Sequence, residues 1–128
     1  MNPKWKLALA LVLGVTIGSA AVQRLHAQAK PKVYQVSEVE ILDAEAYKAF
    51  IQAVRDTVQQ QASGRILASA NAKVIASVGD PPKQVGISEF DSLEQAEAYR
   101  NSPAAKDLGA LRNKALKIVR QYTVISEN

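Results

Sequence analysis

Two glutamates are the residues of this chain best suited to acid–base chemistry. Glu38 and Glu89 lie in segments where polar and apolar residues alternate, and both are predicted to point to the helix-free side of a sheet. A carboxylate in a desolvated cavity can have a raised pKa and act as a general base. The alternative is a structural carboxylate in an ion pair, for example with Arg65 or Arg100, because buried charges are usually paired.

Three further side chains are candidate ligand contacts. Arg65 follows the predicted end of a helix, and its planar guanidinium can bind the carboxylate of a ligand or pair with Glu38 or Glu89. Tyr34 and Tyr99 can line a pocket with their rings and orient a ligand with their hydroxyls.

Several chemistries are excluded once residues 1–29 are treated as a targeting segment. The only histidine, His26, lies in this segment, and the chain has no cysteine. A disulfide, a zinc site with His or Cys ligands, and a nucleophile activated by histidine are therefore not expected. We predict no metal and no cofactor. Haem or flavin binding is a third, weaker hypothesis, in which haem would need a tyrosine ligand.

The first 29 residues have the pattern of a secretory signal peptide. Lys4 and Lys6 precede the uncharged run 7–22, and Ala27-Gln28-Ala29 has the small residues that a signal peptidase accepts. The alternative is a retained membrane anchor, but the run is 16 residues long and a spanning helix needs about 20. We predict cleavage after Ala29, a periplasmic or secreted protein, and only transient membrane contact.

Charge argues against nucleic-acid binding by the exported part. The whole chain has 16 basic and 12 acidic residues, for a net charge of +4. Lys4, Lys6 and Arg24 leave with the signal peptide, so 13 basic and 12 acidic residues remain, a net charge of +1. A nearly neutral domain has little electrostatic attraction for a phosphate backbone.

After a short leader (30–32), the pattern predicts a single α+β domain over residues 33–126. Asp43, the pair Ser92 and Gln95, and Ser102-Pro103 are typical starts of helices. Strands are predicted at 33–41, 65–70, 73–78, 84–90 and 121–126. This order of strands and helices is that of a ferredoxin-like sandwich, an antiparallel sheet with helices on one face.

Two local predictions concern the ends of helices. Gly64 is expected to end the first helix, because glycine tolerates the left-handed conformation found there. The last helix is expected to bury a stripe of apolar residues, namely Leu108, Leu111, Ala115, Ile118 and Val119.

The helix-free face of the predicted sheet is apolar. It carries Tyr34, Val36, Leu67, Val85 and Ile87, and such a surface would be unfavourable in water. We therefore predict a homodimer in which two sheets pack through this face.

Five blocks of sequence, in order and at fixed spacing, carry a family resemblance. They are Glu38 with 43–47, Gly64-Arg65, 79–83, 87–96 and 101–103. Together they resemble the bacterial domain-of-unknown-function family 1330, which implies a ferredoxin-like fold of the dimeric α/β-barrel group and no particular reaction. Family aromatics are replaced here at Ile66, Arg100 and Ala105, which predicts a smaller or differently shaped pocket.

Two functions fit these observations. The first is an exported dimer without catalytic activity that binds a small ligand or has a structural role. The alternative is a cofactor-free enzyme in which Glu38 or Glu89 acts as general base and Arg65 orients an anionic substrate.

Overall fold

The computed structural model describes residues 30–127 with the exception of Ser63. The strands are β1 (Val33–Ile41), β2 (Arg65–Ala68), β3 (Gln84–Phe90) and β4 (Leu116–Ile125), and the helices are α2 (Ala44–Ala62), α3 (Leu93–Asn101), α4 (Pro103–Asp107) and α5 (Gly109–Ala115). The predicted signal peptide, residues 1–29, lies outside the described residues.

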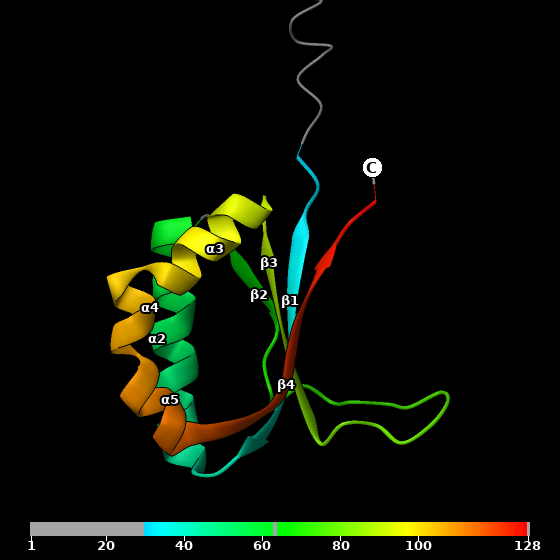
Figure 1. Cartoon of the computed structure of the whole chain (residues 1–128). Helices are drawn as coiled ribbons and strands as arrows, with labels where there is room; N and C mark the ends of the chain where they lie inside the picture. Colours follow the sequence, from blue (N-terminus) through cyan, green and yellow to red (C-terminus); the bar gives the residue numbers. More distant parts are fainter. Residues whose placement is uncertain (1–29, 63, 128) are drawn as a thin grey trace, which may run out of the picture.

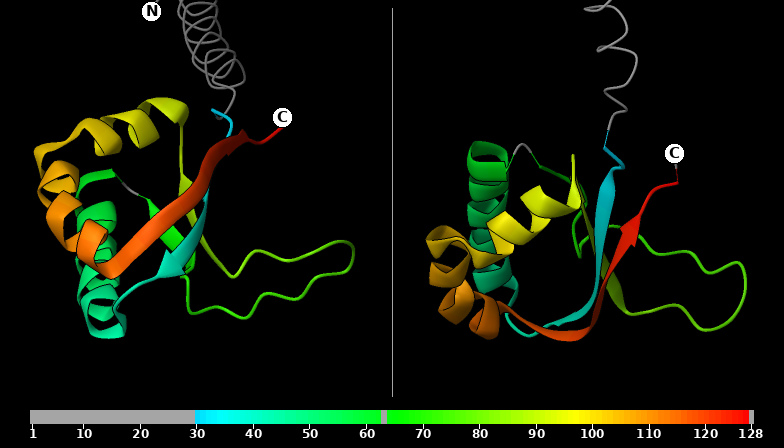
Figure 2. Two further views of the ribbon diagram at one scale, coloured as in Figure 1. Left: turned by 60° about the horizontal axis from the view of Figure 1, so that its bottom comes forward. Right: turned by 45° about the horizontal axis from the view of Figure 1, so that its top comes forward.

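The strands form one antiparallel sheet in the order β2-β3-β1-β4. The described helices all lie on one face of this sheet, and none of them covers the other face (Figures 1 and 2). This arrangement confirms the predicted ferredoxin-like α+β fold. Because successive side chains of a strand point to opposite faces, each strand contributes one set of residues to the helix layer and another to the open face.

Side-chain oxygens start the helices where the sequence predicts them. The N–H of Ala46 donates to Asp43 Oδ1 at 2.9 Å, and the N–H of Gln95 donates to Ser92 Oγ at 3.2 Å. Ser102 caps α4, with Pro103 in its first turn. These bonds satisfy backbone donors that have no partner within a helix.

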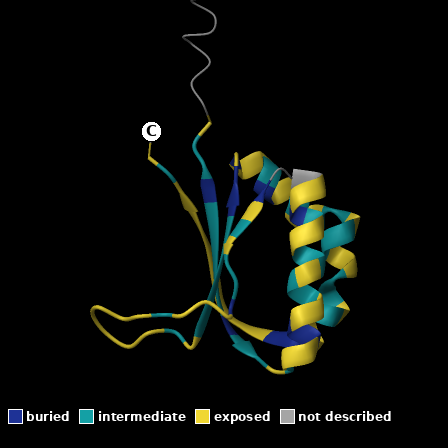
Figure 3. Ribbon diagram, turned by 180° about the vertical axis from the view of Figure 1, so that it is seen from behind, coloured by how far each residue is buried: buried dark blue, intermediate teal, exposed yellow. Residues whose placement is uncertain are grey.

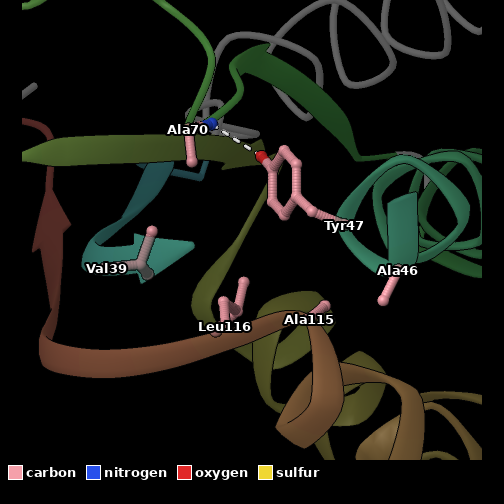
Figure 4. Packing of buried hydrophobic residues seen from close by; sticks show 6 residues of the cluster. All are labelled: Val39, Ala46, Tyr47, Ala70, Ala115 and Leu116. Atoms are coloured by element: carbon pink, nitrogen blue, oxygen red, sulfur yellow. Dashed lines mark hydrogen bonds between the residues drawn. The ribbon is translucent and has the colours of Figure 1, made fainter. Parts of the chain in front are cut away.

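The core lies between the helices and the sheet, in two clusters. One contains Val33, Val58, Phe90 and Ala96. The other contains Val39, Ala46, Tyr47, Ala70, Ala115 and Leu116 (Figure 4). In the second cluster the Ala70 N–H donates to the Tyr47 hydroxyl oxygen at 2.7 Å, which ties the segment after β2 to α2. Figure 3 shows that burial falls off toward the edge strand β4, where only Leu116 is buried.

The strand predicted at 73–78 is wrong. These residues belong to a long irregular segment that projects from the sheet on the side away from the helices (Figure 1). We call residues 71–83 the arm. A strand needs a hydrogen-bonded neighbour, and β2 pairs with β3 only up to Ala68. Ile75 and Val78 in the arm are 75% and 96% exposed.

The last helix is shorter than predicted, because Leu116–Arg120 is strand. Ile118 and Val119 therefore do not belong to a helical stripe. Residues 116–118 pair with residues 39–41 of β1, and β-branched side chains such as those of Ile118 and Val119 suit a strand better than a helix. The register shifts between Glu38 and Val39, whose partners are Arg120 and Ile118.

Gly64 follows α2 as predicted, but for a different reason. Its backbone is not left-handed; among the described glycines only Gly79 has a positive φ, at 73°. A Cβ at position 64 would lie 2.7 Å from Val58 Cγ1 and 3.0 Å from the Glu89 carbonyl oxygen. Glycine is required here because helix and strand approach closely.

Candidate ligand cavity and the helix-free face

A cavity of about 210 Å³ lies between the helices and the sheet. Tyr47, Val58 and Phe90 form part of its buried interior. The exposed residues of its lining are Arg100 in α3, Arg112 in α5, and Ile118 and Gln121 in β4. The mouth of the cavity therefore lies beside the edge strand β4. The remaining walls are mostly apolar, including Phe50, Ile51, Val54, Ala105 and Leu108.

A polar stripe crosses the sheet on the cavity side. Gln35 is the register partner of Ser88, and Ser37 is the partner of Gln121. The Gln121 Nε2 amide donates to Ser37 Oγ at 2.8 Å. All four residues line the cavity, so it offers a ligand neutral hydrogen-bonding groups against an otherwise apolar wall.

Sequence reasoning missed this stripe, although a signal was present. Val33 and Val39 were predicted to share the helix side of β1, and alternation puts Gln35 and Ser37 on the same side. Two polar residues between two buried valines indicate that the sheet is not fully covered there.

Tyr99 is the predicted ligand contact that lines the cavity. Its hydroxyl is 3.0 Å from Thr57 Oγ1 in α2, and its ring centroid is 5.9 Å from that of Phe90. Burial raises the pKa of the Tyr99 hydroxyl above its usual value, so this group is neutral and able to donate a hydrogen bond at physiological pH.

The other predicted contacts lie on the helix-free face. Arg65 Nε donates to Glu89 Oε1 at 2.7 Å, and Lys32 Nζ donates to the same oxygen at 2.9 Å. The hydrogen bond from Lys32, supported by Arg65, lowers the pKa of Glu89 against the opposing effect of desolvation. Glu89 is 6% exposed. Its register partner in β1 is Tyr34, the remaining predicted ligand contact.

Glu38 is also paired on this face. Its Oε2 lies 3.4 Å from Nε of Arg120. It borders a second, smaller hollow of about 100 Å³ together with Glu40, Lys83 and Val119. For both glutamates the structure shows the ion-pair alternative, and neither of them lines the larger cavity. Arg65, the predicted substrate clamp, binds Glu89 itself.

Between these ion pairs the helix-free face carries apolar side chains. Leu67, Tyr122 and Val124 are 50%, 44% and 47% exposed. Tyr122 and Val124 are the register partners of Val36 and Tyr34, so these side chains form a continuous patch across the strands.

Neither a metal-binding cluster nor a membrane-spanning helix is found in the described part of the chain. Residues 30–62 and 64–127 contain no group of three or more His, Cys, Asp or Glu residues arranged to hold a metal ion. In the same part of the chain, no helix has the length and apolar character needed to cross a membrane.

A family model matches most of the chain in sequence. The model described as "Domain of unknown function (DUF1330)" matches residues 32–127. The chain belongs to this family. The DUF1330 resemblance found in the sequence blocks is therefore confirmed. No curated protein matches the chain in sequence.

Solved structures share the fold of this DUF1330 protein at low identity. The RPA0582 protein of Rhodopseudomonas palustris, in its methylated form, has a TM-score of 0.60 at 13% identity, covering 86% of this chain and 91% of that one. A second structure of that protein, described as of unknown function, has a TM-score of 0.56 at 15% identity and covers 87% and 93%. A hypothetical protein of Arabidopsis thaliana has a TM-score of 0.53 at 13% identity and covers 80% and 90%.

Proposed function

We propose that this DUF1330 protein is an exported homodimer that binds a small organic molecule in the cavity between its helices and its sheet. The observation that carries the proposal is the cavity itself, a hollow of about 210 Å³ with apolar walls and a polar stripe. A few polar groups set in an apolar concavity are typical of small-molecule sites. Export rests on the signal-peptide pattern of residues 1–29.

The role is binding without catalysis. Glu38 and Glu89, the candidate general bases, are neutralised by arginine and lysine outside the cavity. A general base must come within hydrogen-bonding distance of its substrate, and these two side chains face the other side of the sheet.

The homodimer is supported by the helix-free face. Its apolar patch includes Leu67, Tyr122 and Val124, and the arm that projects on the same side exposes Ile75 and Val78 (Figure 2). A second copy packed against this face would cover both features. Sedimentation equilibrium should therefore show a dimer at micromolar concentration.

Leu67→Glu should weaken this dimer, whereas Gln59→Glu, the same charge change on the exposed side of α2, should leave it intact. A wild-type chain that sediments as a monomer throughout this range would contradict the dimer.

Ligand binding is tested with benzamide, a neutral molecule with a single ring. Titration followed by amide NMR should shift Ser37, Ser88 and Gln121 saturably, because these residues line the cavity. Ala105→Phe should abolish the shifts by filling the cavity, while Ala110→Phe, at an exposed position of α5, should not. Unchanged spectra at high benzamide concentration would contradict the binding function.

A further inference from the structure

We infer that the ligand of the cavity is a small organic carboxylate, with its anionic group at the mouth beside Arg100 and Arg112. This inference rests on the proposed function, and it adds the charge and size of the ligand.

The first observation is the unbalanced charge of the cavity wall. Arg100 and Arg112 line the cavity, and none of the described aspartates and glutamates does. A concave surface with charge of one sign attracts ligands of the other sign.

The second observation is that these two arginines differ from the paired cations of the molecule. Arg65, Arg120 and several lysines have a carboxylate within 4 Å. Among the described residues, neither Arg100 nor Arg112 has such a partner. The Arg112 guanidinium instead donates to the neutral Asn113 Oδ1, at 3.3 Å and 3.4 Å. Both guanidiniums are therefore available to an anion from solution.

The third observation is the chemistry behind the mouth. The rings of Tyr47, Phe50, Phe90 and Tyr99 line the interior, together with the neutral polar stripe. An inorganic anion would leave this apolar interior without contacts. A molecule with an apolar body and a carboxylate matches both parts, because arginine binds carboxylate through two parallel hydrogen bonds.

The volume limits the size of the body. A protein cavity of about 150 Å³ holds benzene, and pockets for drug-sized ligands begin at about 300 Å³. At about 210 Å³, this cavity accommodates one ring or a short branched chain. Nucleotides and multi-ring compounds exceed it.

The test compares benzoate with benzamide, which have the same ring and nearly the same shape but differ in charge. Amide NMR titrations of the full-length domain at pH 7 and low salt should show benzoate binding about five- to tenfold more tightly, a modest factor because the mouth is open to solvent. This advantage should shrink at high salt, where charges are screened. Inorganic phosphate should not shift the Ser37 and Ser88 amides in the interior.

The double variant Arg100→Gln, Arg112→Gln should bind benzoate and benzamide with about equal affinity, because benzoate loses its charged partners. Arg55→Gln removes an exposed arginine of α2 that does not line the cavity, so the preference for benzoate should persist in it. Equal affinities of the wild type for benzoate and benzamide would overturn the inference that the ligand is a carboxylate. A preference for benzoate that survives the double variant would overturn it as well. If benzamide binds and benzoate has no advantage, the proposed function stands and only this inference fails. If neither probe binds, both fail.

Discussion

The two faces of the sheet handle polar groups in different ways. On the helix-free face, charged carboxylates lie in an apolar surface and each is neutralised: Glu89 by Arg65 and Lys32, and Glu38 by Arg120. On the helix-covered face, the polar groups of the sheet are neutral amides and hydroxyls. The charged residues that line the cavity on that side are Arg100 and Arg112, which belong to the helices and lie at its mouth. No carboxylate of the described residues pairs with them.

This difference agrees with the two proposed roles, contact with a second copy on one face and ligand binding on the other. A face that has to pack against another surface gains from ion pairs that cancel, because an uncompensated charge is costly to desolvate. A cavity that has to attract and hold a ligand gains from charge that is left free. Alternation along β1 and β3 allows one sheet to present both kinds of surface, since neighbouring residues such as Glu89 and Phe90 point to opposite sides.

Of the substitutions that compare the two faces, Phe90→Ala should lower the free energy of unfolding most. Phe90 is 1% exposed beneath the helices, and truncating a buried phenylalanine costs about 3–5 kcal/mol. Urea denaturation at a concentration where the chain is monomeric measures this loss. Leu67→Ala, on the open face, should then cost about 1 kcal/mol or less. Equal losses would show that the two faces do not differ in packing.

Gly64→Ala should come next. Its Cβ would lie 2.7 Å from Val58 Cγ1 and 3.0 Å from the Glu89 carbonyl oxygen, and overpacking of this kind costs about 1–3 kcal/mol. The same experiment on Gly109→Ala provides the control, since nothing lies within 4 Å of a Cβ there. A Gly64→Ala protein as stable as the wild type would show that helix and strand have room to separate at this end of the sheet.

The sequence was sufficient to predict those features that depend only on residues close together in the chain. The bounds of β1 and β3 follow from alternation, and the caps at Asp43, Ser92 and Ser102 follow from local hydrogen bonding. The apolar spacing of Ala115, Ile118 and Val119 fits a helix, and only the ladder with β1 shows that the last two belong to a strand.

The arm and the cavity could not be predicted in this way. Residues 73–78 have the composition of a strand, but whether they pair depends on which strands the sheet places beside them. The Arg65–Glu89 pair was among the predicted alternatives, because a buried carboxylate is usually paired with a cation. The cavity depends on how far the helices stand from the sheet, and that distance is set by contacts between distant segments.

Glu89→Gln should lower the stability at neutral pH by less than the two substitutions above, and this loss should shrink as the pH falls. Because the Lys32 hydrogen bond, with help from Arg65, lowers the folded-state pKa of Glu89, the ionised carboxylate stabilises the fold fully above its unfolded pKa of about 4.3. This stabilisation is lost as the pH falls from there through the lower folded pKa.

Urea denaturation of both proteins between pH 6 and pH 3 measures this effect. The stability of Glu89→Gln should fall less steeply with acidification than that of the wild type. Some loss should remain, since the hydrogen bond from Lys83 also lowers the pKa of Glu40. Glu97→Gln removes an exposed carboxylate of α3 and should follow the wild-type curve. If Glu89→Gln also follows it, the ion pairs of the open face do not contribute to stability, and the contrast between the two faces would rest on the cavity alone.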